Sequence, residues 1–91
     1  MTIKHDADSQ AFTGTEDGHS VELTYFSPTP GTIDFTHTFV DEALRGRGLA
    51  DELARAGLAY ARGQGLKVKT SCSFMRAFVE RHQAEYGDLV G

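Results

Sequence analysis

The sequence predicts a single α+β domain with the element order β-β-β-β-α-β-α and a mostly antiparallel sheet. Two observations lead to this fold class. Apolar and polar residues alternate over His19–Phe26 and over Thr32–Val40, as they do in half-buried strands. The apolar spacing then becomes helical between residues 49 and 61 and alternates again over Leu66–Ser71. A chain of 91 residues has room for one hydrophobic core.

The first half of the chain is expected to form four strands. Residues 2–6 and 10–15 are candidate short strands, followed by a turn at residues 16–18. Residues 27–31 contain two prolines and a glycine, which cannot continue a ladder, so the strands on either side form an antiparallel hairpin. Strict alternation on the second of these strands would place four side chains on one face: Ile33, Phe35, His37 and Phe39.

The second half is expected to contain both helices. Seven residues form one apolar helical stripe: Leu49, Ala50, Leu53, Ala54, Gly57, Leu58 and Ala61. Asp51 and Arg55 are four residues apart on the opposite side, which favours an ion pair. The strand at 66–71 should run parallel to the strand at 32–40 through a right-handed crossover. Apolar residues at helical spacing predict a second helix over residues 74–82.

Composition and charge exclude several classes of protein. The apolar fraction of 40% is too high for a disordered chain, and no apolar run approaches the ~20 residues of a membrane span. The net charge of −4 argues against nucleic acid as a partner. A single cysteine cannot form an internal disulfide, and no signal sequence is visible at the start, so we expect a cytoplasmic protein.

The charge is unevenly divided along the chain. Residues 1–43 hold one basic and eight acidic side chains, whereas residues 44–91 hold eight basic and five acidic ones. One explanation is chance, because so few charged residues can divide unevenly between the two halves. The alternative is that the second half binds an anion, while the first half faces water or a cationic partner.

The most informative segment is RGRGLA at residues 45–50, between a strand and a helix. The first N–H groups of a helix lack intrahelical acceptors and the helix dipole makes this end positive, so phosphate is a favoured ligand. An exposed helix start without a ligand is the alternative. The segment lacks the Gly-Lys-Ser/Thr of a P-loop and the third glycine of a dinucleotide fingerprint, and it is not repeated as RNA-binding Arg-Gly segments are.

This segment resembles the Arg/Gln-x-x-Gly-x-Gly/Ala signature of the GNAT acetyltransferase superfamily, with Arg45, Gly48 and Ala50 at the defined positions. Three further segments resemble small GNAT-like proteins of the YjdJ type: THTFV at 36–40, CSF at 72–74 and YGDLV at 86–90. The family usually has HPEY in its tail, where this chain has HQAEY. The resemblance implies one minimal GNAT-like domain over residues 1–91, with a twisted sheet and splayed central strands.

The resemblance also implies that acetyl-coenzyme A (acetyl-CoA) is the co-substrate. Its diphosphate would lie on the backbone amides of the glycine-containing segment, and its pantetheine arm would run between the strands at 32–40 and 66–71. The implied coenzyme-binding residues are Val40, Arg45, Gly46, Arg47, Gly48, Leu49 and Ala50. No metal site is expected, because no pair of His or Cys residues has ligand spacing.

Two side chains are candidates for the chemistry. Acyl transfer to an amine needs a base, because an ammonium has a pKa near ~10. His37 lies about 10 Å from the motif end of its strand, within reach of a pantetheine arm, although spacing alone also fits a core histidine. Cys72 follows the other splayed strand, as a small buried hydrophobe, an acyl-accepting nucleophile or a proton donor. Three tyrosines are equal candidates for the acid: Tyr25, Tyr60 and Tyr86.

The sequence therefore predicts a small GNAT-like N-acyltransferase that moves an acetyl group from acetyl-CoA to an unidentified amine, either a small molecule or a protein lysine. The chain is short for the superfamily and lacks the length for the helical pair that commonly walls the acceptor site. Two alternatives stay open: a non-catalytic acyl-CoA-binding sensor or interaction module, and a structural domain without a coenzyme site. Neither nucleic acid nor a membrane is an expected partner.

Overall fold

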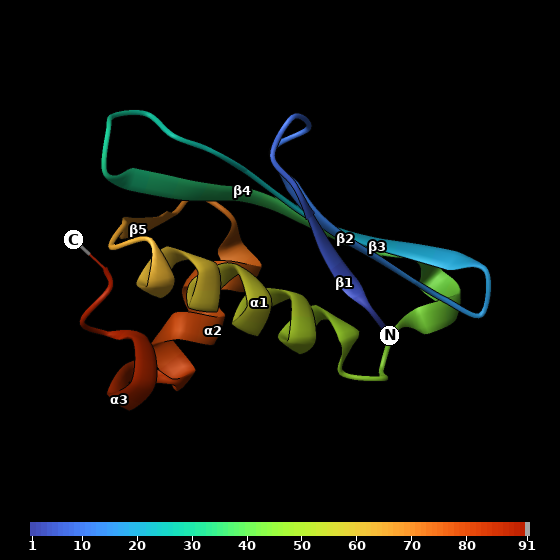
Figure 1. The fold of residues 1–91 in the computed structure, drawn as a ribbon. Coiled ribbons are helices and arrows are strands. Elements are labelled where there is room, and N and C mark those ends of the chain that lie inside the picture. The colour runs from blue at the N-terminus through green and yellow to red at the C-terminus, as the bar shows by residue number, and fades with distance from the viewer. Residues whose placement is uncertain (91) are drawn as a thin grey trace.

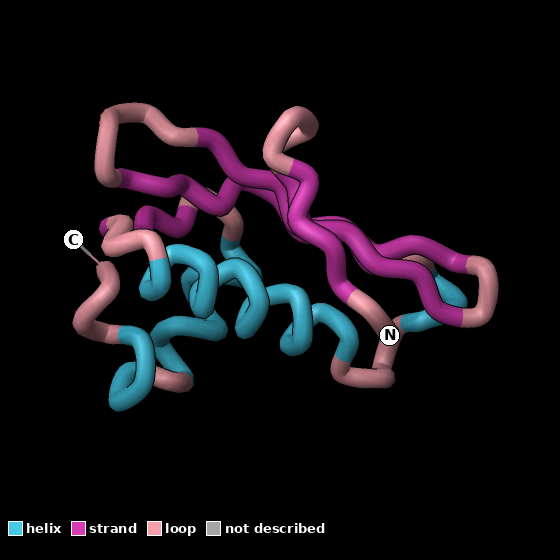
Figure 2. Tube along the Cα trace, viewed as in Figure 1, coloured by secondary structure: helices cyan, strands magenta, loops and turns pink. Residues whose placement is uncertain are grey.

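The computed structural model describes residues 1–90, in which five strands form one sheet and three α-helices lie on one side of it (Figures 1 and 2). The strands are β1 (Ile3–Asp6), β2 (Ala11–Glu16), β3 (His19–Phe26), β4 (Thr32–Val40) and β5 (Lys67–Thr70). The helices are α1 (Leu49–Gly63), α2 (Ser73–Arg81) and α3 (Gln83–Tyr86), with a short 3-10 helix at Glu42–Leu44. None of the helices described is long and apolar enough to cross a bilayer.

The order of the elements confirms the predicted α+β class and adds the 3-10 helix and α3. Strands β1 to β4 pair as antiparallel neighbours, and β5 pairs with β4 in parallel after the crossover through α1. The splayed pair expected from the resemblance is β4 and β5, and β5 lies at the edge of the sheet rather than in its interior. An isolated parallel bridge between Val68 and Val90 adds the C-terminal segment to that edge.

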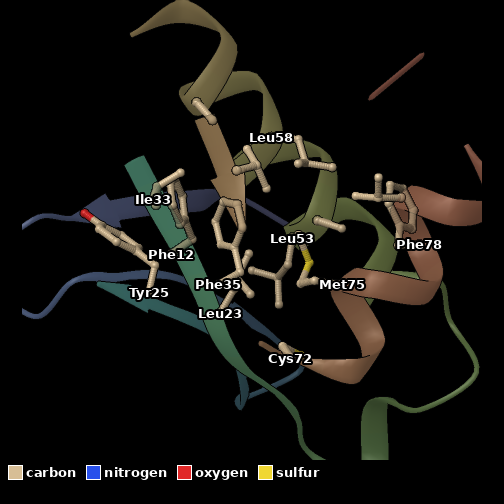
Figure 3. Close-up of a cluster of buried hydrophobic side chains, with 14 of the residues drawn as sticks. Phe12, Leu23, Tyr25, Ile33, Phe35, Leu53, Leu58, Cys72, Met75 and Phe78 are labelled. Atoms are coloured by element: carbon tan, nitrogen blue, oxygen red, sulfur yellow. The ribbon is translucent and has the colours of Figure 1, made fainter. Parts of the chain in front are cut away.

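The hydrophobic core lies between the sheet and the helices (Figure 3). The predicted stripe on α1 is confirmed, since all of it except the half-buried Ala50 is buried. Phe35 and Leu23 approach α1 from the sheet, while Met75 and Phe78 enter the same core from α2. Both helices thus pack on one face of the sheet, and no helix among residues 1–90 covers the other face.

The predicted ion pair between Asp51 and Arg55 is wrong. Arg55 instead donates hydrogen bonds to the Glu85 carboxylate at 3.2 Å and to the Tyr86 hydroxyl at 3.1 Å. Its guanidinium also lies 5.4 Å from the centre of the Phe78 ring, within cation–π range. A tertiary contact with α2 and α3 therefore replaces the local contact along α1.

A β-bulge in β4 changes its register with β3. Tyr25 is opposite Phe35, but the next residue of β3, Thr24, is opposite His37. Thr36 is therefore the extra residue. Two hydrogen bonds hold it: the Thr36 hydroxyl donates to the Thr24 carbonyl at 3.3 Å, and the two threonine hydroxyls lie 3.2 Å apart.

The bulge overturns the predicted face of β4 beyond Phe35. Ile33 and Phe35 are buried against the helices as expected, but His37 and Phe39 are exposed on the uncovered face. Thr38 takes their place on the helix face, opposite the buried Leu23 of β3. The physical reason is that one extra residue exchanges the two faces of a strand for every residue after it.

At Gly57, α1 packs so closely on the sheet that a side chain has no room. A Cβ there would lie 2.8 Å from Phe35 Cε1 and 2.9 Å from Leu23 Cδ2. We expect Gly57→Ala to lower the free energy of unfolding by about 1–2 kcal/mol, because overpacking outweighs the gain in helix propensity. Urea unfolding measures this difference. Gly63→Ala is the control: its Cβ would meet open space, and it should gain about 0.5–1 kcal/mol. A Gly57→Ala protein as stable as this control would contradict the prediction.

Candidate functional site

The glycine-containing segment at residues 45–50 leads from the 3-10 helix into α1. Gly46 and Gly48 have φ angles of 84° and 76°, in the left-handed region that glycine adopts without a steric cost. Gly48 is the N-cap residue of α1 and has no side chain with which to bond the first amides of the helix. The local sequence thus produces a sharp entry into α1 and leaves its N-terminus uncapped.

The backbone amides of this segment are unpaired. Within the part of the chain that is described, no hydrogen bond uses the N–H groups of residues 46–50, and the first helical bond runs from the Glu52 N–H to the Gly48 carbonyl at 3.2 Å. The 3-10 helix just before has its own hydrogen bonds: the Asp41 side chain accepts from the Ala43 N–H, and the Asp41 carbonyl accepts from the Leu44 N–H. A row of free donors therefore begins at Gly46 and ends in the first turn of α1, where the helix dipole is positive.

Two arginines flank this row of amides. Arg47 Nη1 lies 2.6 Å from Asp17 Oδ2, which ties the segment to the turn between β2 and β3. Arg45 donates from Nε to the Val40 carbonyl at 3.4 Å, and its side chain is exposed. Arg45 adds positive charge beside the free amides, whereas Asp17 offsets the charge of Arg47. The first turn of α1 also carries the acidic Asp51 and Glu52.

Strands β4 and β5 separate partway along β4. Their pairing ends at Phe35 and Thr70, and the last backbone hydrogen bond between the two segments is the Cys72 N–H donating to the Phe35 carbonyl at 2.9 Å. The chain then enters α2, while β4 continues over residues 36–40 with no strand on that side among the described residues. We name the space between residues 36–40 and residues 71–73 the fork.

The edge of β4 at the fork presents free backbone groups. The Asp41 N–H donates to the Ser20 carbonyl on β3 at 3.2 Å, and the His37 carbonyl also faces β3, where it accepts from Thr24 at 3.3 Å. Because an antiparallel strand alternates the direction of its backbone groups, those of Thr38 and Val40 point toward the fork.

The structure places the two predicted catalytic residues on different faces of the sheet. Cys72 is buried at the fork on the helix face, where its Sγ lies 3.3 Å from the Thr38 hydroxyl. His37, the residue before Thr38, is exposed on the uncovered face. The two side chains thus lie on either side of the fork, and the hydrogen-bonding partner of Cys72 within residues 1–90 is Thr38 rather than His37.

The tyrosines considered as acids make their contacts elsewhere. The Tyr25 hydroxyl is hydrogen-bonded to His5 of β1, and burial raises the pKa of Tyr25 above its usual value. The ring of Tyr60 packs against His5 and Phe12, and Tyr86 is bound by Arg55. No group of three His, Cys, Asp or Glu side chains within residues 1–90 is arranged to hold a metal ion.

Sequence reasoning missed three residues at the fork. Thr38 was placed on the outward face by simple alternation, and the bulge that reverses it leaves no mark in the pattern. Asp34 also alternates with Ile33 and Phe35 and so was expected to be exposed, yet it is 7% exposed and bonds to Ser71, which is exposed as alternation predicts. The one available signal was a carboxylate in the middle of an otherwise apolar and threonine-rich strand.

Comparison with known proteins shows the family of the chain. A model of GCN5-related N-acetyltransferases matches residues 10–89. The chain belongs to this family. Protein NATD1 of Gallus gallus and of Homo sapiens are each 30% identical to it over 84 residues, covering 90% of this chain and 76% and 74% of theirs. A GCN5-like protein of Staphylococcus aureus, solved by NMR, superposes with a TM-score of 0.77 at 29% identity, over 99% of this chain and 87% of that one. GNAT stands for GCN5-related N-acetyltransferase, and the GNAT-like fold predicted from the sequence is thereby confirmed.

Proposed function

We propose that this GCN5-related chain binds acetyl-CoA and transfers its acetyl group to an amine. The observation that supports this best is the row of free amides at residues 46–50. It lies at the N-terminus of a 15-residue helix, next to a strand whose edge is open. A diphosphate is the kind of anion that such a helix end binds. The residues that would hold the coenzyme are those named from the sequence: Val40, Arg45, Gly46, Arg47, Gly48, Leu49 and Ala50.

The open edge of β4 suits the amide-containing arm of the coenzyme. The backbone groups of Thr38 and Val40 face the fork, and an extended ligand can bond to them as an added strand would. Val40 already accepts a bond from Arg45, but that bond is 3.4 Å long and exposed, so it is readily exchanged. This route leads from the free amides toward Cys72.

His37 is the residue we propose as the base. The coenzyme supplies a carbonyl activated as a thioester, and the acceptor must lose a proton before it can attack. His37 is exposed on the face that no described helix covers, so a solvated ammonium can reach its imidazole. Cys72, buried on the other face beside Thr38, would line the acetyl pocket.

The acceptor is proposed to be cationic, such as a polyamine or a lysine side chain. Residues 1–43, which supply β1 to β4, carry eight acidic side chains and one lysine, and every acidic side chain except the buried Asp34 is at least partly exposed. Such a surface raises the local concentration of cations. The free thiol of Cys72 suits a reducing compartment, so we propose the cytoplasm as the location.

One observation favours a second candidate, a non-catalytic acyl-CoA-binding module. The one side-chain hydrogen bond at His37 uses its backbone carbonyl, and no helix among residues 1–90 covers its face of the sheet, so no partner within these residues orients the imidazole for proton transfer. Such a module would use the same amides and the same fork.

Two measurements test the proposal. Titration with acetyl-CoA should raise the free energy of unfolding by about 2.7 kcal/mol at a concentration 100 times the Kd, and dephospho-CoA serves as a comparison ligand. Mixed amines should then cause steady release of free CoA thiol. Binding without release would support the binding module instead, and no binding would contradict both candidates.

A further inference from the structure

Asp34 is a buried acidic side chain that the proposed function does not use. It is 7% exposed and is the one buried charged residue among residues 1–90. Its Oδ1 accepts from the Ser71 N–H at 3.0 Å, and its Oδ2 accepts from the Ser71 hydroxyl at 2.7 Å. Burial of a carboxylate is unfavourable unless donors satisfy it, and both donors here belong to one residue of the segment between β5 and α2.

The bond to Asp34 changes how the β4–β5 ladder ends. The Lys67 N–H donates to the Gly31 carbonyl, on the β4 side, whereas the Val68 N–H points the other way, to the Leu89 carbonyl. Alternation along a parallel strand would therefore aim the Ser71 N–H at the carbonyl of Phe35. That N–H goes to the Asp34 side chain instead.

As a consequence, the residue that donates to the Phe35 carbonyl is shifted by one position. The Phe35 carbonyl accepts from the Cys72 N–H at 2.9 Å, in place of the Ser71 N–H. The side chain of Cys72 then reaches Thr38 at 3.3 Å. Asp34 thus binds the Ser71 N–H, which would otherwise have continued the β4–β5 ladder. The Cys72 N–H makes the last bond of the ladder instead.

We propose that Asp34 is a positioning residue that stops β5 from pairing further along β4 and so sets where the fork opens. In doing so it keeps Cys72 beside Thr38 at the start of α2. This inference deepens the proposed function, because the fork is where we place the thioester.

The test measures the accessibility of Cys72, which needs neither coenzyme nor turnover. Asp34→Ala removes both acceptors, Ser71→Ala removes only the hydroxyl, and Asp34→Asn keeps an acceptor for the amide and can donate to the hydroxyl. Phe12→Leu is the control, since it weakens the core from β2, away from the fork. Iodoacetamide alkylation of Cys72 is followed by intact mass over a series of urea concentrations below the unfolding transition. Alkylation through global unfolding accelerates with urea, whereas alkylation through local opening hardly does.

We expect Asp34→Ala to raise the urea-independent rate at least 10-fold and Ser71→Ala to raise it about 3-fold. Asp34→Asn should remain within about 2-fold of the original protein, and Phe12→Leu should change only the urea-dependent rate. If Asp34→Ala and Ser71→Ala alter only the urea-dependent rate, as the control does, the inference is overturned. If Asp34→Ala does not fold, the comparison of Ser71→Ala with the control decides.

A second readout connects the fork to the reaction. Asp34→Ala should lower the turnover number at least 10-fold, a larger factor than the increase in the Kd for acetyl-CoA, because the fork changes while the free amides at residues 46–50 are untouched. Asp34→Asn should restore turnover. A chain that binds no acetyl-CoA would refute the proposed function and leave the alkylation result standing, so the two failures can be told apart.

Discussion

Replacing Gly48 with aspartate will weaken the binding of acetyl-CoA about 100-fold, because it puts a fixed negative charge within the row of amides that we propose for the diphosphate. At an effective dielectric constant of about 20, two unit charges about 6 Å apart repel each other by about 2–3 kcal/mol, which corresponds to about 100-fold in Kd. Gly48 is the N-cap of α1 and lies within the row of free amides, and its Cβ would meet no protein atom within 4 Å. The substitution therefore acts on the ligand site and not on the packing.

Gly48→Asn is the matched control for this experiment. Asparagine has the same size, tolerates a φ of 76° about as well, and carries no charge. The aspartate variant should be about 0.3–1 kcal/mol more stable than the asparagine variant, because a carboxylate at a helix N-terminus interacts favourably with the dipole. Stability and coenzyme binding should thus change in opposite directions. Equal acetyl-CoA affinity in the two variants, measured by calorimetry, would show that the diphosphate lies elsewhere.

Much of the fold could be predicted from local patterns, because apolar residues repeat with one spacing in a strand and with another in a helix. The alternation over β3 and the stripe on α1 predicted which side chains would be buried, and the two prolines of residues 27–31 predicted the hairpin between β3 and β4. The partner of Arg55 could not be predicted in the same way. This partner, Glu85, lies 30 residues away in α3, and no sequence pattern around Arg55 indicates it.

The row of free amides in the candidate site was predictable from the sequence, and the fork was not. Glycines before a helix are a local signal, so the segment at 45–50 stands out from the sequence alone. The bulge at Thr36 is a property of the β3–β4 pair, and it reverses the faces of His37 and Thr38 without a change in composition. The Asp34–Ser71 bond joins residues 37 apart in the chain, and such contacts depend on the finished sheet.

The second large effect concerns His37, which we expect to be needed for proton removal. His37→Gln should lower kcat/KM for the amine about 10²–10⁴-fold, the usual loss when a general base is removed. The Kd for acetyl-CoA should change less than about 3-fold. The reason is that the imidazole is exposed on the uncovered face, whereas the free amides lie at the N-terminus of α1.

The pH dependence separates loss of the base from a structural effect. Above a pH of ~10 an alkyl amine is already neutral and needs no base, so the deficit of His37→Gln should shrink as the pH approaches that value. His19→Gln is the matched control, since His19 is also exposed on the sheet but lies near Asp41 at 3.4 Å, and it should leave turnover unchanged. A deficit that stays constant with pH would assign His37 to acceptor binding. Unchanged turnover in His37→Gln would remove it from the reaction and favour a module that binds the thioester without using it.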